Sequence, residues 1–160
     1  MEKLNKIFIH PQYQQWLTKI EEHEKERLFC KHDMVHFLNV ARIAYILSLE
    51  MGLDIPKEYI YTVALLHDIG KYKQYEDGTK HSIVSAHLAE GLLKEVGFDS
   101  EAISNILEAI ENHNNLKRID EKSLVGIICK ADKMSRECHS CDVNGQCYWD
   151  KDLKNLQIRV

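Results

Sequence analysis

The pentapeptide His67-Asp68-Ile69-Gly70-Lys71 places an imidazole and a carboxylate side by side at the end of an apolar, helix-like stretch. The preceding residues, 60–66, are almost wholly apolar apart from Thr62. An ionisable pair in such a place is costly unless a metal ion or hydrogen-bond partners satisfy it. The doublet therefore suggests a metal site, and the alternative is a His-Asp pair that caps a helix at the surface.

Residues of the ligand type recur at other points of the chain. They lie near one end or on the inner face of successive expected helices, and they are His36, His81, His113 and Asp132. His36 shares a helical stripe with Val40 and Leu47, so its side chain is expected to point inward. A helical bundle builds a metal site from several facing helices, and imidazole with carboxylate suits Fe, Mn, Co, Ni or Zn.

The elements that must position these residues are all expected to be helices. The apolar period and the capping residues predict helices over 11–27, 33–51, 54–70, 80–96, 100–113 and 120–132, with a loop at 75–79. Gly52 and Gly97 are expected to end the second and the fourth helix, and Asp120 to cap the last. No segment alternates as a strand does, so we expect an all-α bundle of about six or seven helices.

Composition limits the class of protein. A chain of 160 residues with 44% hydrophobic content fits one domain. The net charge of −4 gives no support for a DNA-binding surface, although a local basic pocket can still hold a phosphate. No apolar run of about 18 residues and no secretion signal is evident, so we expect a cytoplasmic protein without membrane contact. A homodimer is the commonest assembly for such a chain.

The order and separation of the ligand-type residues then match a family. His36, the His67-Asp68 doublet and Asp132 resemble the H…HD…D signature of the HD-domain metal-dependent phosphohydrolases. The resemblance covers about residues 29–136, and it implies that 1–160 form one HD domain, an all-α bundle. Residues 137–160 would then be a tail that packs on the core.

Two further segments resemble the two-metal members of that family. Residues 81–86 and 109–113 look like the extra histidine segments of the YqeK-type dinucleoside tetraphosphate hydrolases and the HD-GYP cyclic-dinucleotide phosphodiesterases. The resemblance implies six ligands around two ions, with Asp68 as the bridging carboxylate. These ligands are His36, His67, Asp68, His81, His113 and Asp132.

The resemblance implies hydrolysis of a phosphoester or phosphoanhydride, in a nucleotide or a related small molecule, by a metal-activated hydroxide. Asp68 or Asp132 is then the acceptor of the water's proton. Lys71 can bring a cation over the pocket, and Arg42 and Lys133 are further candidates for phosphate contact.

Two other functions fit the same ligand set. Within the same superfamily, an HD site can hold a di-iron pair that activates oxygen and cleaves a C–C or C–P bond. An HD domain can also use its metal pocket to sense a nucleotide without turnover. The sequence leaves both alternatives open.

The remaining histidines have simpler interpretations. His87 lies six residues after the His81 ligand, about 240° round a helix, so it is expected to be a surface or packing residue. His32 either reaches the mouth of the site or is a solvated residue at a helix start. His10 and His23 are expected on the surface, and Asp33 is expected to complement a helix dipole rather than to bind metal.

The chain has five cysteines, an odd count that argues against a disulfide framework. Cys138, Cys141 and Cys147 follow the last expected helix and have the spacing of a thiolate metal site that lacks its fourth ligand. Cys30 could supply that ligand, which would suit structural zinc or an iron–sulfur cluster.

His139 and Cys129 are poorer candidates for the fourth ligand. The alternative is a tail that carries reduced thiols without a metal. Tyr148 and Trp149 are expected to pack this tail on the bundle.

Overall fold

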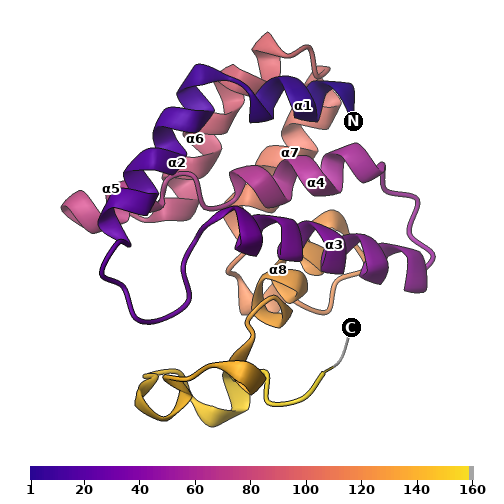
Figure 1. Cartoon of the computed structure of the whole chain (residues 1–160). Helices are drawn as coiled ribbons and strands as arrows, with labels where there is room; N and C mark the ends of the chain where they lie inside the picture. The colour runs from indigo at the N-terminus through magenta and orange to yellow at the C-terminus, as the bar shows by residue number, and fades with distance from the viewer. Residues whose placement is uncertain (159–160) are drawn as a thin grey trace.

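A computed structural model describes residues 1–158, and these residues form eight α-helices and no strand. The helices are α1 (Glu2–Phe8), α2 (Pro11–His23), α3 (Met34–Glu50), α4 (Lys57–Leu66), α5 (Lys71–Asp77), α6 (His81–Glu95), α7 (Ser100–Asn112) and α8 (Leu124–Met134) (Figure 1). The described residues also form four short 3-10 turns, η1 (Leu116–Arg118), η2 (Cys138–Ser140), η3 (Asn144–Gln146) and η4 (Lys151–Leu153). None of the helices in these residues is both long and apolar enough to cross a membrane.

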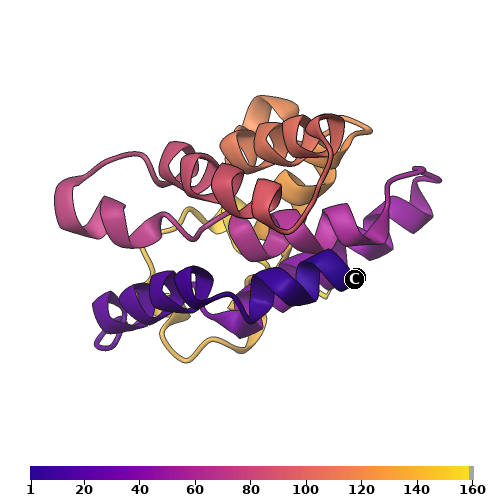
Figure 2. The same ribbon diagram turned by 90° about the horizontal axis from the view of Figure 1, so that it is seen from above.

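Helix α4 lies at the centre of the bundle. It contacts α1, α3, α6, α7 and α8, and every residue from Ile60 to Leu66 except Tyr61 is buried. Figure 2 shows α1 and α2 (indigo) on the opposite side of the bundle from α6 and α7 (pink to orange). A helix that is apolar all round belongs in the interior. The apolar run before the His-Asp doublet is therefore the central helix, and it delivers the doublet to the middle of the bundle.

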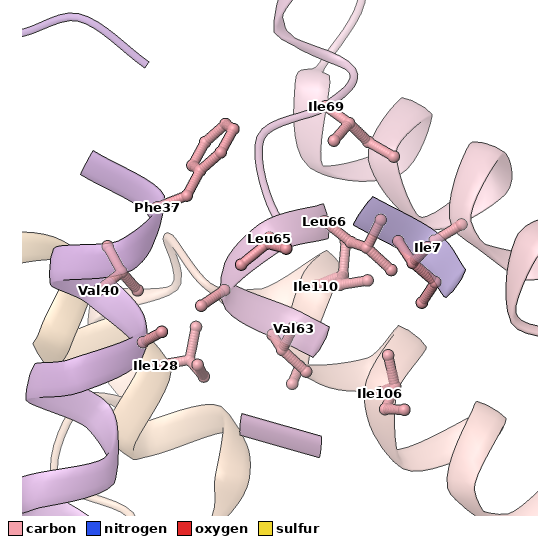
Figure 3. Packing of buried hydrophobic residues seen from close by; sticks show 14 of the residues in the cluster. Ile7, Phe37, Val40, Val63, Leu65, Leu66, Ile69, Ile106, Ile110 and Ile128 are labelled. Atoms are coloured by element: carbon pink, nitrogen blue, oxygen red, sulfur yellow. The ribbon is translucent and has the colours of Figure 1, made fainter. Parts of the chain in front are cut away.

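The core around α4 draws side chains from most of the other helices. Figure 3 shows part of it, in which Val63 and Leu66 lie among Ile7, Phe37, Val40, Ile106, Ile110 and Ile128. All of these side chains are almost completely removed from solvent. Burying one such side chain contributes about 1.5 to 3 kcal/mol, so this cluster dominates the stability of the bundle.

The expected all-α bundle is confirmed, and so are several helix ends. Gly52 and Gly97 adopt φ angles of 64° and 87° directly after α3 and α6. Asp33 caps α3, because its side chain accepts a hydrogen bond from the backbone N–H of His36 at 2.9 Å. These positions follow local rules for helix termini, which explains why they could be predicted.

The helix expected over 54–70 is wrong at its end. Helix α4 ends at Leu66, the doublet lies in a turn, and α5 starts at Lys71. The loop expected at 75–79 was also wrong in its first half, because α5 continues to Asp77 and ends at Gly78. The side chain of Tyr72 is buried, so α5 is held by tertiary packing that no local turn signal reveals.

Two other helix boundaries differ from the expected ones. Helix α2 ends at His23 rather than near residue 27, since Glu24 leaves the helix with its side chain buried. Helix α8 begins after Ser123, whose hydroxyl accepts a hydrogen bond from the backbone N–H of Gly126 at 3.3 Å, and not at Asp120. Helix α1 lies outside the segments that the apolar period predicted.

The segment after α8 folds back toward the bundle. The side-chain amide of Asn155 donates hydrogen bonds to the carbonyl oxygens of Lys133 (2.7 Å) and Arg136 (3.0 Å). The ring of Tyr148 packs edge-on against Phe29, with ring centroids 5.5 Å apart. Figure 1 shows this segment (orange to yellow) below α8, on the side where the loop between α2 and α3 passes. The tail and that loop thus meet, although they are far apart in sequence.

Gly70 fixes the doublet against α6. Its backbone N–H donates to the hydroxyl of Ser85 at 2.9 Å. A Cβ atom at position 70 would lie 2.6 Å from the backbone nitrogen of Ser85 and 2.7 Å from the carbonyl oxygen of His81. Since both of these are backbone atoms in a helix, they cannot move without shifting α6. The close approach therefore requires glycine.

We expect Gly70→Ala to lower the free energy of unfolding by about 1 to 3 kcal/mol, the usual cost of overpacking a rigid interior. Thermal or urea unfolding of the purified variant measures this. Gly91→Ala is the matched control. Gly91 lies on α6, and a Cβ atom at this position would meet nothing within 4 Å. Alanine at position 91 should keep or raise stability. Equal stability of the two variants would contradict the role of Gly70.

Candidate metal centre

The six ligand-type residues come together from five places in the fold. His36 lies in the first turn of α3, His67 and Asp68 follow α4, His81 begins α6, His113 ends α7 and Asp132 lies in the last turns of α8. They form two groups that share Asp68. The four-ligand group is His36, His67, Asp68 and Asp132; the three-ligand group is Asp68, His81 and His113. Within each group the ligand atoms all lie within 4.8 Å of one another.

Protein acceptors hold the outer nitrogens of the histidine rings. Nδ1 of His67 lies 2.7 Å from the carbonyl oxygen of Ala64, and Nδ1 of His113 lies 2.7 Å from that of Ile110. A carbonyl oxygen only accepts, so each Nδ1 carries the proton. In a neutral ring this leaves the Nε2 lone pair free, and in both residues Nε2 faces the site. This arrangement is typical of histidines that bind metal.

The other two rings follow the same pattern. Nδ1 of His81 lies 2.7 Å from the side-chain oxygen of Gln74. Nδ1 of His36 lies 3.2 Å from the hydroxyl of Ser135, and that hydroxyl donates its own hydrogen to the carbonyl oxygen of Asp132. The hydroxyl oxygen is thus left to accept from His36. All four rings therefore direct Nε2 inward.

The inward nitrogens lie close to one another. Nε2 of His81 is 3.1 Å from Nε2 of His113, and Nε2 of His36 is 3.3 Å from Nε2 of His67. Two nitrogen lone pairs at such distances repel each other unless a cation lies between them. The donor set thus fits a pair of metal ions, one in each group.

The Asp68 carboxylate joins the two groups. Its Oδ2 lies 3.3 Å from Nε2 of His67, and its Oδ1 lies 3.1 Å from Nε2 of His81. The side chain is 4% exposed, and Oδ1 is buried without a hydrogen-bond partner. A buried oxygen left unpaired is costly, and a bound cation would remove that cost. One oxygen facing each group is the arrangement expected of a bridging carboxylate.

The charges of both carboxylates depend on their neighbours. Burial by itself raises the pKa of Asp68, but the imidazoles of His67 and His32 outweigh burial and hold this pKa well below its usual value. Burial likewise raises the pKa of Asp132, and the ammonium of Lys133 together with His67 brings it below its ordinary value. Both carboxylates are therefore ionised and ready to bind a cation at neutral pH.

A cavity of about 600 Å³ opens above the two groups. It is lined by residues of both groups and by Lys71 and Lys133, two of the cations that the sequence suggested for phosphate contact. The ammonium of Lys133 is paired with Oδ2 of its neighbour Asp132. The cavity is also lined by the neighbouring aromatic rings of Phe29, Tyr148 and Trp149. The cavity thus joins a charged floor with an aromatic wall.

The structure does not bring Arg42, the third cation expected near a phosphate, to the main cavity. Arg42 is exposed and lines a neighbouring pocket of about 240 Å³, which shares Arg136 with the main cavity but does not include Asp68. It follows His36 by six residues, about 240° round the helix, so the two side chains leave α3 in different directions. Arg136 lines the main cavity, and it was not among the cations predicted from the sequence. Arg136 follows Asp132 by four residues, a spacing that places two side chains on the same face of a helix and could have indicated this position.

The structure also decides between the two interpretations of His32. Nε2 of His32 lies 3.7 Å from Oδ2 of Asp68, so His32 reaches the site. His87 is exposed on α6, as expected. His10 and His23 face Glu95 and Glu76 at 3.2 Å and 3.9 Å, away from the centre.

The cysteines are only partly gathered. Cys30, Cys138, Cys141 and Cys147 all line the main cavity. Within residues 1–158, however, the groups whose ligand atoms lie within 4.8 Å of one another contain no cysteine. The buried Cys129 thiol instead contacts the carbonyl oxygen of Asn115 at 3.6 Å. The thiolate site for zinc or an iron–sulfur cluster therefore stays a prediction.

Comparison with known proteins agrees with this centre. A protein of Clostridium beijerinckii described as uncharacterized is 40% identical over 158 residues, which cover 99% of both chains. YueE of Bacillus subtilis, named a putative phosphohydrolase, is 30% identical over 145 residues, 82% of this chain and 74% of YueE. Ribonuclease Y of Mycoplasma mycoides subsp. mycoides is 29% identical over 102 residues, which are 64% of this chain and 18% of the ribonuclease.

A solved structure and a family profile identify the fold. The crystal structure of a predicted HD superfamily hydrolase from an uncultured Thermotogales bacterium matches with a TM-score of 0.61 and 26% identity, over 89% of this chain and 81% of that chain. The sequence profile of the HD domain matches residues 34–137, a range that includes all six residues of the centre. The chain therefore belongs to the HD domain family, within the HD hydrolase superfamily.

Proposed function

We propose that the protein is a metal-dependent phosphohydrolase that acts on a nucleotide or a related phosphoester or phosphoanhydride. The observation that carries the proposal is the set of inward Nε2 atoms around the buried Asp68 carboxylate. Such a set repels itself and leaves an oxygen unpaired, so it requires cations. The name of the YueE relative, a putative phosphohydrolase, supports the reaction class.

The donor atoms suit particular metals. Imidazole nitrogens and carboxylate oxygens favour Fe, Mn, Co, Ni or Zn over ions that select thiolate ligands. The four-ligand group would hold one ion and the three-ligand group a second, with Asp68 in contact with both. Bound divalent ions lower the pKa of a coordinated water and neutralise charge on phosphoryl oxygens.

The chain's own side chains would then serve the reaction. Asp68 and Asp132 are the carboxylates close enough to accept the proton of the attacking water. The ammonium groups of Lys71 and Lys133 line the cavity and would neutralise the phosphate. These roles require no nucleophilic side chain.

The aromatic side of the cavity supports a nucleotide as the substrate. The guanidinium of Arg136 stacks on the ring of Trp149, 3.8 Å from its centroid. Arg136 lines the cavity, so its guanidinium can donate to an oxygen of a ligand. A cavity of about 600 Å³ has the size of a small-molecule site. A planar base beside this wall would place its phosphates toward the charged floor.

The proposed function predicts metal-dependent turnover of nucleotides. We expect the purified protein to hydrolyse nucleotides with Mn, Co or Fe supplied, and Asp68→Ala to reduce the rate on the order of a hundredfold or more, because both ion sites lose a ligand. Phosphate release measures this. His87→Ala is the control, because His87 is exposed on α6 and should leave the rate unchanged.

Three outcomes would contradict the proposal. Full metal-dependent turnover by Asp68→Ala would remove Asp68 from the reaction. Oxygen consumption by a reduced di-iron form without phosphate release would indicate an oxygenase. Tight nucleotide binding without turnover under any metal would indicate a sensor.

The two ligand groups predict the metal content of the protein. After removal of metal with a chelator and dialysis against Mn, we expect two ions per chain by elemental analysis, one for each ligand group. His113→Ala should retain one, because the four-ligand group does not contain His113. A single ion per chain in the unaltered protein would contradict a dinuclear centre.

The aromatic wall and Arg136 are expected to contribute to nucleotide binding. Arg136→Ala should raise KM for a nucleotide about 5- to 30-fold with a smaller change in kcat, since a hydrogen bond from a charged donor contributes about 1 to 2 kcal/mol to binding. Hydrolysis of p-nitrophenyl phosphate, which has no base to place there, should change less. Arg42→Ala is the matched control, because Arg42 lies outside the cavity. Equal effects of the two arginine variants would refute the assignment.

A further inference from the structure

His32 and Glu24 form a buried pair at the edge of the centre that the six-ligand set leaves out. Glu24 is 2% exposed, and its carboxylate accepts hydrogen bonds from Nδ1 of His32 and from the hydroxyl of Tyr75. It also accepts from the backbone N–H of His32 at 2.6 Å. Three donors thus converge on one buried carboxylate, which rigidly fixes the His32 ring.

Glu24 is ionised in this environment. Burial alone raises its pKa, but the hydrogen bonds that it accepts from His32 and Tyr75 lower the pKa below its usual value. An ionised carboxylate only accepts hydrogen bonds, so Nδ1 of His32 carries a proton. The ring atom left for other contacts is Nε2.

Nε2 of His32 points at the centre. It lies 3.7 Å from Oδ2 of Asp68, and Nε2 of His36, a member of the four-ligand group, lies 3.8 Å from the same oxygen. Nitrogen and oxygen ligands lie about 2.0 to 2.2 Å from a metal ion, so two atoms bound to one ion are separated by up to about 4.3 Å. By this distance His32 can share an ion with Oδ2, as His36 can, although only His36 belongs to a group whose ligand atoms all lie within 4.8 Å of one another.

His32 also has the same support as the other histidines of the centre. Each of those rings presents Nδ1 to an oxygen acceptor and directs Nε2 inward. His32 has the strongest acceptor among them, a buried carboxylate, and such carboxylate–histidine pairs orient metal ligands and raise their basicity. His32 lies outside the compact four-ligand group and approaches it at Asp68, on the side that lines the cavity.

We propose that Nε2 of His32 is a further metal ligand on the cavity side of Asp68, and that Glu24 orients it. This inference rests on the proposed metal centre. It adds one ligand whose position depends on the loop between α2 and α3, and it gives the buried Glu24 a role as the outer partner of that ligand. Tyr75 supports the same carboxylate from α5.

Metal affinity tests this proposal without reference to turnover. We expect Glu24→Gln to weaken binding of one of the two ions about 10- to 100-fold, the usual loss when an outer-shell partner is removed. His32→Ala removes the ligand itself and should weaken binding of that ion at least as much. Competition with a chelating dye measures the affinity for Mn or Co. With Co bound, His32→Ala should also change the visible absorption, because the set of ligand atoms changes.

Tyr75→Phe is the matched control. It removes one hydrogen bond from Glu24 but leaves the bond to His32, so metal affinity should remain close to that of the unaltered protein. Wild-type affinity and an unchanged cobalt spectrum in His32→Ala would overturn the proposal while the proposed function stands. Equal losses in Tyr75→Phe and Glu24→Gln would also overturn it, since they would indicate a purely structural role. An unaltered protein that binds no metal would instead refute the proposed function itself.

Discussion

The structure depends on one constraint, the burial of the Asp68 carboxylate at the end of the most buried helix. Helix α4 is surrounded by other helices, so the two residues that follow it, His67 and Asp68, are almost completely removed from solvent. A carboxylate in such a place loses its hydration and must be compensated. Histidines from four helix termini provide part of that compensation, and the unpaired Oδ1 shows that protein groups alone do not complete it.

The same constraint explains the arrangement of the helices. The ends of α4 and α7 and the starts of α3 and α6 meet around Asp68, and each of these termini carries a histidine. Gly70 allows the turn after α4 to touch the backbone of α6, which brings His81 to the second oxygen of the carboxylate. Backbone atoms hold the rings of His67 and His113, so the centre is rigid before any ion binds.

The cavity above the centre has two origins. Its floor comes from the helical bundle, which carries the charged groups. Its wall comes from the tail after α8 and the loop between α2 and α3, which supply Arg136, Trp149 and Phe29. Both segments lie outside the eight α-helices of the bundle. A division of this kind lets the chemistry stay the same while substrate preference varies with the loops.

The amino-acid sequence by itself determined the helical class and the six residues of the centre. Apolar periods and caps are local properties, and the ordered His and Asp spacing carried the family resemblance. The tertiary structure alone decided which other groups join them. It placed Arg42 outside the main cavity and brought Arg136 and His32 to that cavity, with Glu24 hydrogen-bonded behind His32. Those contacts depend on irregular segments far apart in the chain, where no period predicts the direction of a side chain.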